Sequence, residues 1–136
     1  MKELIDSENY DLLIVDANSL IYRTHYAALQ SNLTWRGLPV AATYGFFNIL
    51  LKTVQMYPTK YLALCWDVSK QTFRNELFPE YKAGRAPMPE ELKVQLPLLQ
   101  NALHLSAFAQ LGYKGYEADD LIGSLSFAAA EKGWRS

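Results

Sequence analysis

Five carboxylates in this 136-residue chain stand at three places from which acidic side chains could share one metal ion. Asp16 and Asp67 each end an apolar run, and Glu117, Asp119 and Asp120 lie together where a helix is expected to begin. Carboxylates that lie close together repel one another, so such a cluster is costly unless cations neutralise it. Oxygen-only ligands favour hard cations, and the pattern therefore predicts a site for Mg²⁺ or Mn²⁺.

The two apolar runs are typical of buried parallel strands, expected over residues 11–16 and about 60–66. Open α/β sheets bind ligands just beyond the carboxyl ends of their strands. If the two strands are parallel and adjacent, Asp16 and Asp67 arrive at the same edge of the sheet. The sequence therefore predicts an α/β fold with the acidic residues at one sheet edge.

Helical patterns account for most of the remaining chain. Pro97 should kink or split the helix expected from about residue 89, because proline lacks the backbone N–H that a helix interior needs. Residues 30–38 are expected to be a polar loop, and a short third strand is expected near Tyr113. The helices are expected at about 20–29, from 39 to the residue before Pro58, from about 89 onward, and at about 117–131.

Each acidic group also has an ordinary structural explanation. An aspartate after a strand is often a turn residue or a helix cap, and acids in the first turn of a helix interact favourably with its dipole. At about 100° per residue, Glu117 and Asp120 lie on one side of the last helix, whereas Asp119 lies further round. This geometry permits a shared site without requiring one. Together, the two strand-ending aspartates and the helix cluster favour the metal site.

The segment after Asp67, residues 68–91, combines basic and aromatic residues with three prolines and one glycine. Basic side chains beside aromatic rings can hold a phosphate backbone and stack on bases. The alternative is a solvated loop whose charges are balanced locally by Glu76 and Glu80. The position of the segment, directly after a site carboxylate, favours binding. Its candidate contact residues are Arg74, Tyr81, Lys82 and Arg85.

Composition narrows the class of protein. Half of the residues are hydrophobic, enough for a packed core, and the formal net charge is −1, so any basic surface must be local. A single cysteine, Cys65, allows no disulfide within the chain, which fits a reducing cytoplasm. The first ten residues lack the pattern of a secretory signal, and no apolar stretch is long enough for a bilayer. We expect a cytoplasmic protein without a membrane partner.

Six motifs follow one another along about residues 11–133: Leu13–Asp16 with Tyr22 and Arg23, Thr43–Phe47, Thr72–Arg74, Phe78–Lys82, Arg85–Pro89 and Gly115–Asp120. The order and the residues of these motifs closely resemble those of the bacterial 5′-nuclease family. This family is the N-terminal 5′→3′ exonuclease domain of DNA polymerase I, related to flap endonucleases and to the PIN-like superfamily. The resemblance implies a twisted, mainly parallel sheet flanked by helices.

The resemblance also implies an activity, namely cleavage of DNA 5′ ends and flaps with divalent metal ions. It implies Mg²⁺ or Mn²⁺, with two ions in the complete domain, and a helical arch whose basic residues hold the scissile phosphate. Lys82 and Arg74 would act at the reacting phosphate. By the same resemblance the metal ligands are Asp16, Asp67, Glu117, Asp119 and Asp120, and the DNA contacts are Arg23, Arg74, Tyr81, Lys82 and Arg85.

The resemblance implies that the family continues beyond this chain, with a strand carrying further metal-binding aspartates and then a helix–hairpin–helix region. We therefore expect residues 1–136 to be the N-terminal part of the 5′→3′ exonuclease domain, truncated before the later strands. We expect little or no nuclease activity from the isolated chain. An exposed sheet edge is expected to pair with a second copy of the chain.

The leading hypothesis is a divalent-metal-dependent 5′→3′ exonuclease and 5′-flap endonuclease. The alternative is a non-catalytic remnant of that domain that binds nucleic acid or another partner. A phosphate-transferring enzyme with an aspartyl nucleophile is disfavoured. Such enzymes usually place a second acid two residues after the first, where this chain has Asn18, and no activating arrangement is visible.

Overall fold

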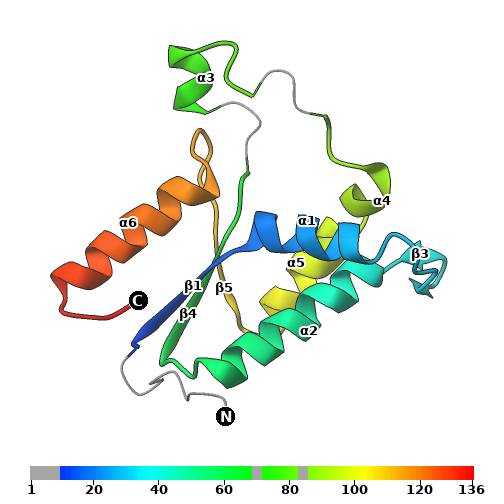
Figure 1. The fold of residues 1–136 in the computed structure, drawn as a ribbon, viewed down its shortest axis with the longest axis horizontal. Coiled ribbons are helices and arrows are strands. Elements are labelled where there is room, and N and C mark those ends of the chain that lie inside the picture. Colours follow the sequence, from blue (N-terminus) through cyan, green and yellow to red (C-terminus); the bar gives the residue numbers. More distant parts are fainter. Residues whose placement is uncertain (1–9, 69–71, 83–85) are drawn as a thin grey trace.

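The computed structural model of the chain describes residues 10–68, 72–82 and 86–136. It has an α/β architecture in which a parallel sheet lies between helices (Figure 1). The elements are β1 (Leu12–Asp16), α1 (Ala17–Ala27), β2 (Thr34–Trp35), β3 (Leu38–Pro39), α2 (Ala41–Met56), β4 (Tyr61–Cys65), α3 (Phe73–Leu77), α4 (Glu90–Lys93), α5 (Leu96–Leu105), β5 (Ala109–Leu111) and α6 (Ala118–Glu131).

The main sheet contains three parallel strands in the order β1-β4-β5. In the register of β1 and β4, Leu12 lies opposite Tyr61 and Asp16 lies opposite Cys65. The predicted pair of neighbouring parallel strands is therefore confirmed. Because the strands are parallel, all their carboxyl ends meet at one edge of the sheet.

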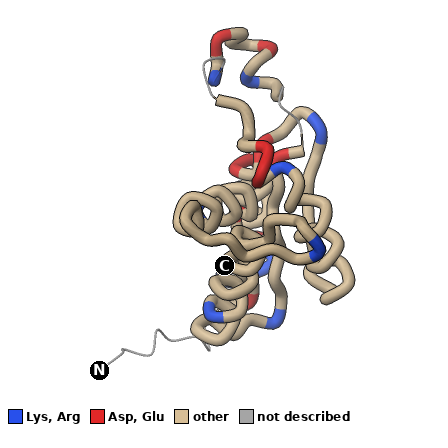
Figure 2. Tube along the Cα trace, turned by 90° about the vertical axis from the view of Figure 1, so that its right-hand side faces the viewer, with Lys and Arg blue, Asp and Glu red and all other residues tan. Residues whose placement is uncertain are grey.

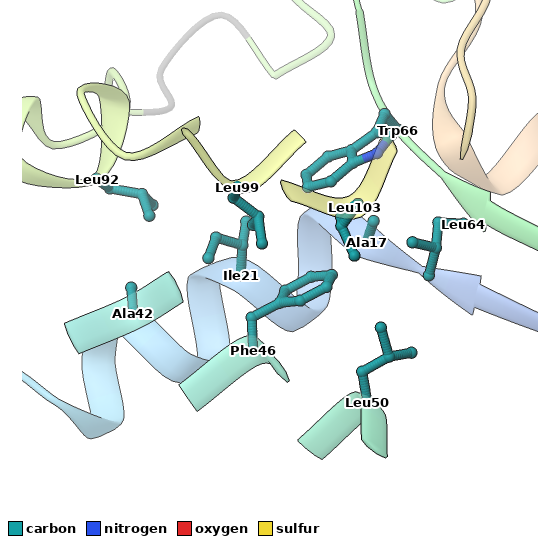
Figure 3. Packing of buried hydrophobic residues seen from close by; sticks show 10 residues of the cluster. All are labelled: Ala17, Ile21, Ala42, Phe46, Leu50, Leu64, Trp66, Leu92, Leu99 and Leu103. Atoms are coloured by element: carbon teal, nitrogen blue, oxygen red, sulfur yellow. The ribbon is translucent and has the colours of Figure 1, made fainter. Parts of the chain in front are cut away.

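Helices cover both faces of the sheet. α6 packs against β1 and β4 on one side, while α1, α2 and α5 lie on the other (Figure 1). The main core fills the second side, where the rings of Phe46 and Trp66 stack with centroids 6.0 Å apart. Fully burying a side chain such as Phe46 stabilises the fold by about 1.5–3 kcal/mol. The other buried members shown in Figure 3 are Ala17, Ile21, Ala42, Leu50, Leu64, Leu92, Leu99 and Leu103.

A buried glutamine joins the start of α2 to the break between α4 and α5. Gln95, only 2% exposed, accepts hydrogen bonds at Oε1 from the Thr43 N–H at 3.1 Å and the Thr43 hydroxyl at 3.0 Å. Its Nε2 donates to the Glu91 carbonyl. The Thr43 N–H is among the first four of α2, which have no partner within a helix. Pro97 is the second residue of α5, so the predicted split near this proline is confirmed.

Two local expectations differ from the structure. Residues 34–38, expected to lie in a polar loop, and Pro39, expected to begin a helix, form the β2–β3 hairpin. The two turn residues Arg36 and Gly37 have φ of 49° and 79°. Left-handed turn residues suit a tight hairpin, but arginine followed by glycine is a weak signal for it. The third strand lies at Ala109–Leu111, before Tyr113, because its pairing with β4 ends where the Trp66 N–H donates to the Leu111 carbonyl.

The C-terminal residues lie beside the beginning of β1. The Arg135 carbonyl accepts hydrogen bonds from the N–H groups of Asp11 and Leu12, and the Trp134 ring stacks on Tyr61 at 4.8 Å. β1 and β5 are the edge strands of the sheet, and pairing of an edge with a second copy of the chain stays a prediction. Among the residues that the structure describes, no helix is long and apolar enough to span a membrane.

We predict that Gln95→Leu destabilises the fold, because the Thr43 N–H would be left buried without an acceptor. The expected loss in the free energy of unfolding is about 1–3 kcal/mol, measured by urea denaturation. Ser106→Ala is the control, since the Ser106 hydroxyl bonds the Ala102 carbonyl at an exposed helix end. A Gln95→Leu protein as stable as the control would show that this side chain does not hold α2 in place.

Candidate functional site

Asp16, the last residue of β1, is also the N-cap of α1. Its Oδ1 accepts a hydrogen bond from the Ser19 N–H at 3.0 Å, and its Oδ2 accepts one from the Ser19 hydroxyl at 2.8 Å. The capping role considered from the sequence is therefore present. Each carboxylate oxygen has a second lone pair, so Asp16 keeps the capacity to bind a cation.

Asp67 connects three elements just beyond the end of β4. Its N–H donates to Asn18 Oδ1 at 2.7 Å, and its Oδ1 accepts from the Ala118 N–H at the start of α6. Burial raises the pKa of Asp67, and the negative charges of Glu117 and Asp16 add to this rise against the effect of the Ala118 bond. Asp67 therefore lies among carboxylates that make its own charge unfavourable.

Two acids at the start of α6 share a guanidinium group from α3. Arg74 Nη2 bonds Asp120 Oδ1 at 2.7 Å, while its Nη1 bonds Asp120 Oδ2 at 2.9 Å and Glu117 Oε2 at 2.7 Å. Asp120 Oδ2 also accepts the Glu117 N–H at 2.8 Å, which completes a capping box. The hydrogen bonds from Arg74 hold the pKa of Asp120 below its usual range. The prediction that Glu117 and Asp120 lie on one side of the helix agrees with this shared partner.

The basic segment, residues 72–82, also supplies Lys82 and Tyr81 to the same acids. Lys82 Nζ lies 2.6 Å from Glu117 Oε1, and the Tyr81 hydroxyl lies 3.4 Å from Glu117 Oε2. Figure 2 shows acidic residues at the upper end of the main body, beneath the segment that carries α3. The alternative prediction was that Glu76 and Glu80 balance the basic charges locally. It was wrong for Arg74 and Lys82, which form ion pairs with Glu117 and Asp120 at the start of α6.

A cleft of about 940 Å³ lies between the basic segment and the edge of the sheet. It is lined on the sheet side by Asn18 and Asp67, on the α6 side by Glu117, and on the other side by Tyr81 and Lys82. Ligand sites commonly have volumes of about 300–1,000 Å³, so the cleft has room for a substrate group beside the carboxylates.

Other candidate residues lie apart from this cleft. Asp119 is exposed in the first turn of α6, and Arg23 lines a smaller hollow with Asp16 beside β1. Arg85 lies outside the described residues. Within residues 10–68, 72–82 and 86–136, no three acidic, histidine or cysteine side chains converge closely enough to hold an ion. Arg74 and Lys82 take up the oxygens of Glu117 and Asp120 instead.

The sequence analysis did not identify the contact between Asn18 and Asp67. Asp16 caps the helix, and the Asn18 side chain reaches across to the neighbouring strand. The position of Asn18 in the sequence could have indicated this contact. Asn18 is the second residue after Asp16, which ends β1, so it lies at the same sheet edge as the end of β4.

A family model described as "5′-3′ exonuclease, N-terminal resolvase-like domain" matches residues 11–136. The chain belongs to this family of nucleases. It is 41% identical over 123 residues to the thermostable DNA polymerase I of Thermus thermophilus. The aligned residues are 90% of this chain and 15% of that protein. It is 40% identical over 114 residues to DNA polymerase I of Caldicellulosiruptor bescii, over 84% of this chain and 13% of that protein. The chain thus spans only a small part of these relatives.

Solved structures support the same fold. T5 5′-exonuclease with bound zinc superposes with a TM-score of 0.64 at 23% identity, over 89% of this chain and 45% of that one. The flap endonuclease of bacteriophage T5, in a pseudo-enzyme-product complex with DNA and metal ions, superposes with a TM-score of 0.63 at 25% identity, with the same coverages. The predicted nuclease fold, with a parallel sheet between helices, is confirmed.

We predict that Asp67→Asn stabilises the metal-free protein at pH 7. A carboxyl whose folded pKa is raised loses stability as pH rises from the ordinary aspartate pKa of about 3.9 through the folded pKa. An amide removes that cost and can still accept the Ala118 N–H. The gain should vanish near pH 3, where Asp67 is protonated in both states.

Thermal unfolding at the two pH values, with a chelator present, measures this difference. Asp119→Asn is the matched control, because Asp119 is exposed and should show no gain at pH 7. If Asp67→Asn unfolds at or below the wild-type temperature at pH 7, burial and the neighbouring charges do not make the Asp67 carboxylate unfavourable.

Proposed function

We propose that the chain is a divalent-metal-dependent 5′→3′ exonuclease and 5′-flap endonuclease domain that hydrolyses DNA phosphodiester bonds. One observation carries the proposal: acids from β1, from the residues after β4 and from α6 lie around the carboxyl edge of the sheet, facing a basic segment. Acidic and basic side chains in this arrangement suit a cation on one side and a phosphate on the other.

The chemistry of the acidic residues fits Mg²⁺ or Mn²⁺. All the candidate ligands are carboxylates, namely Asp16, Asp67, Glu117, Asp119 and Asp120, and such ions prefer oxygen. Burial raises the pKa of Asp67 and the nearby acids add to this rise, so a cation at this place would relieve an unfavourable charge. When bound, a divalent ion supplies Lewis-acid polarisation of a phosphoryl oxygen, and we propose two ions for the complete domain. The metal ions in the T5 structures support metal dependence.

The protein's own residues would bind and orient the DNA. Arg74 has a planar guanidinium that matches a phosphate as well as a carboxylate, and Lys82 adds a compact charge beside Glu117. At the reacting phosphate, Lys82 would stabilise the negative charge that develops in the transition state. Tyr81 offers a ring for base stacking and Arg23 a further phosphate contact. Arg85, outside the described residues, completes the proposed set.

The alternative is a remnant that binds nucleic acid without cutting it. It is favoured by the ion pairs that take up Glu117 and Asp120, and by the lack of a converging group of three ligands among the described residues. Binding and cleavage of a DNA flap distinguish the two hypotheses.

We predict that the isolated chain shows little or no divalent-ion-dependent cleavage of a labelled 5′-flap duplex, measured under single-turnover conditions with protein in excess. Asp67→Ala should abolish any residual cutting, whereas DNA binding, followed by fluorescence anisotropy, should persist through Arg74 and Lys82. Lys132→Ala is the control, because Lys132 follows the far end of α6. Residual cleavage that depends on the ion and on Asp67 would support the catalytic function, whereas DNA binding that neither an ion nor Asp67→Ala affects would favour the remnant.

We also predict that Arg74→Ala strengthens Mn²⁺ binding, because Arg74 competes with the ion for Glu117 and Asp120. A partly exposed ion pair contributes up to about 1 kcal/mol, so the dissociation constant should fall by about fivefold. Titration followed by electron paramagnetic resonance measures free Mn²⁺. Weaker binding by the Arg74→Ala protein than by the Lys132→Ala control would show that Arg74 helps to form the ion site.

A further inference from the structure

The hydrogen-bond ladder between β1 and β4 stops at Cys65, two residues before Asp67. β1 ends at Asp16, opposite Cys65, and the chain then turns into α1. The residue directly after β4 is Trp66. Its N–H donates to the Leu111 carbonyl on the β5 side at 2.8 Å. Since backbone groups alternate from one side of a strand to the other, the Asp67 N–H points back toward β1, where no strand remains.

Asn18 supplies the missing acceptor. Its Oδ1 accepts the Asp67 N–H at 2.7 Å, so a side chain from the first turn of α1 takes the place of the next backbone carbonyl of β1. A short bond of this kind connects residues 49 positions apart. It joins the segment after β4 to the helix that begins with the cap of Asp16.

The Asp67 carboxylate needs such an anchor because its neighbours repel it. Burial disfavours the charge of Asp67, and the charges of Glu117 and Asp16 add to this effect. A carboxylate on a free loop would turn away from like charges toward solvent. Here the main chain is fixed by Asn18 and the carboxylate by the Ala118 N–H, so Asp67 keeps its place beside the acids of α6.

We propose that Asn18 is a positioning residue, whose Oδ1 holds the Asp67 main chain so that the Asp67 carboxylate stays at the proposed ion site. The effect on ion binding rests on the proposed function, whereas the anchoring of Asp67 does not. An amide suits this place because it accepts the N–H without adding another negative charge to an acidic cluster.

Two substitutions separate the acceptor from the shape of the side chain. Asn18→Leu keeps a similar shape but cannot accept a hydrogen bond, whereas Asn18→Asp keeps the acceptor. The first readout is hydrogen exchange of the Asp67 amide, followed by nuclear magnetic resonance. We expect exchange about tenfold faster in Asn18→Leu, the equivalent of one lost hydrogen bond, and near wild-type exchange in Asn18→Asp.

The second readout is Mn²⁺ affinity by electron paramagnetic resonance, compared between wild type and Asn18→Leu. Loss of a residue that orients a ligand weakens metal binding by about tenfold or more. Asn18→Asp is left out of this comparison because its extra charge changes ion binding by itself. Gln95→Leu is the control for general destabilisation, since it breaks a buried network at the start of α2. It should leave Mn²⁺ affinity unchanged and should speed exchange of the Asp67 amide no more than that of other core amides.

The outcomes separate this inference from the proposed function. Unchanged exchange of the Asp67 amide in Asn18→Leu would overturn the inference, as would faster exchange with unchanged Mn²⁺ affinity. Wild-type protein that binds no Mn²⁺ would overturn the proposed metal site. In that case the Asp67 amide would still decide whether Asn18 anchors this segment.

Discussion

The parallel register of β1 and β4 is the constraint on which the rest of the site depends. It brings Asp16 and the residues after Cys65 to one edge, where the start of α6 adds Glu117. Two like charges about 4 Å apart repel by about 4 kcal/mol at an effective dielectric constant of 20. The core around Phe46 and Trp66 holds the strands together despite this repulsion, because the apolar burial that binds helix to sheet would be lost if the edge opened.

The structure offsets the repulsion in three different ways. Asp16 and Asp67 accept hydrogen bonds from backbone N–H groups at the starts of α1 and α6, where the positive end of each helix dipole lies. Glu117 and Asp120 form ion pairs with side chains of the basic segment. Asp119 points its charge to solvent. The acids are therefore stabilised by different partners. The ion pairs of Glu117 and Asp120 depend on the basic segment, which is far away in the sequence.

Local patterns were enough to predict the strands, the aspartates that follow them and the side of α6 that carries Glu117 and Asp120. These features follow from apolar runs and helical periodicity within a few residues of one another. The contact between Arg74 and Asp120 spans 46 residues, and no local pattern encodes it. The β2–β3 hairpin was missed for a different reason, because its turn is made by Arg36 rather than by a residue that commonly adopts a left-handed conformation.

Arg74 and Lys82 face two kinds of anion with the same chemistry. A guanidinium group bonds a carboxylate or a phosphate through the same pair of N–H groups, so it cannot fully serve both at once. In the described structure, carboxylates of α6 hold both cations. If a divalent ion takes over Glu117 and Asp120 as proposed, these carboxylates no longer compete with a DNA phosphate for the two side chains. Ion binding and DNA binding would then favour one another, because the ion neutralises the acids that compete with DNA for the basic segment.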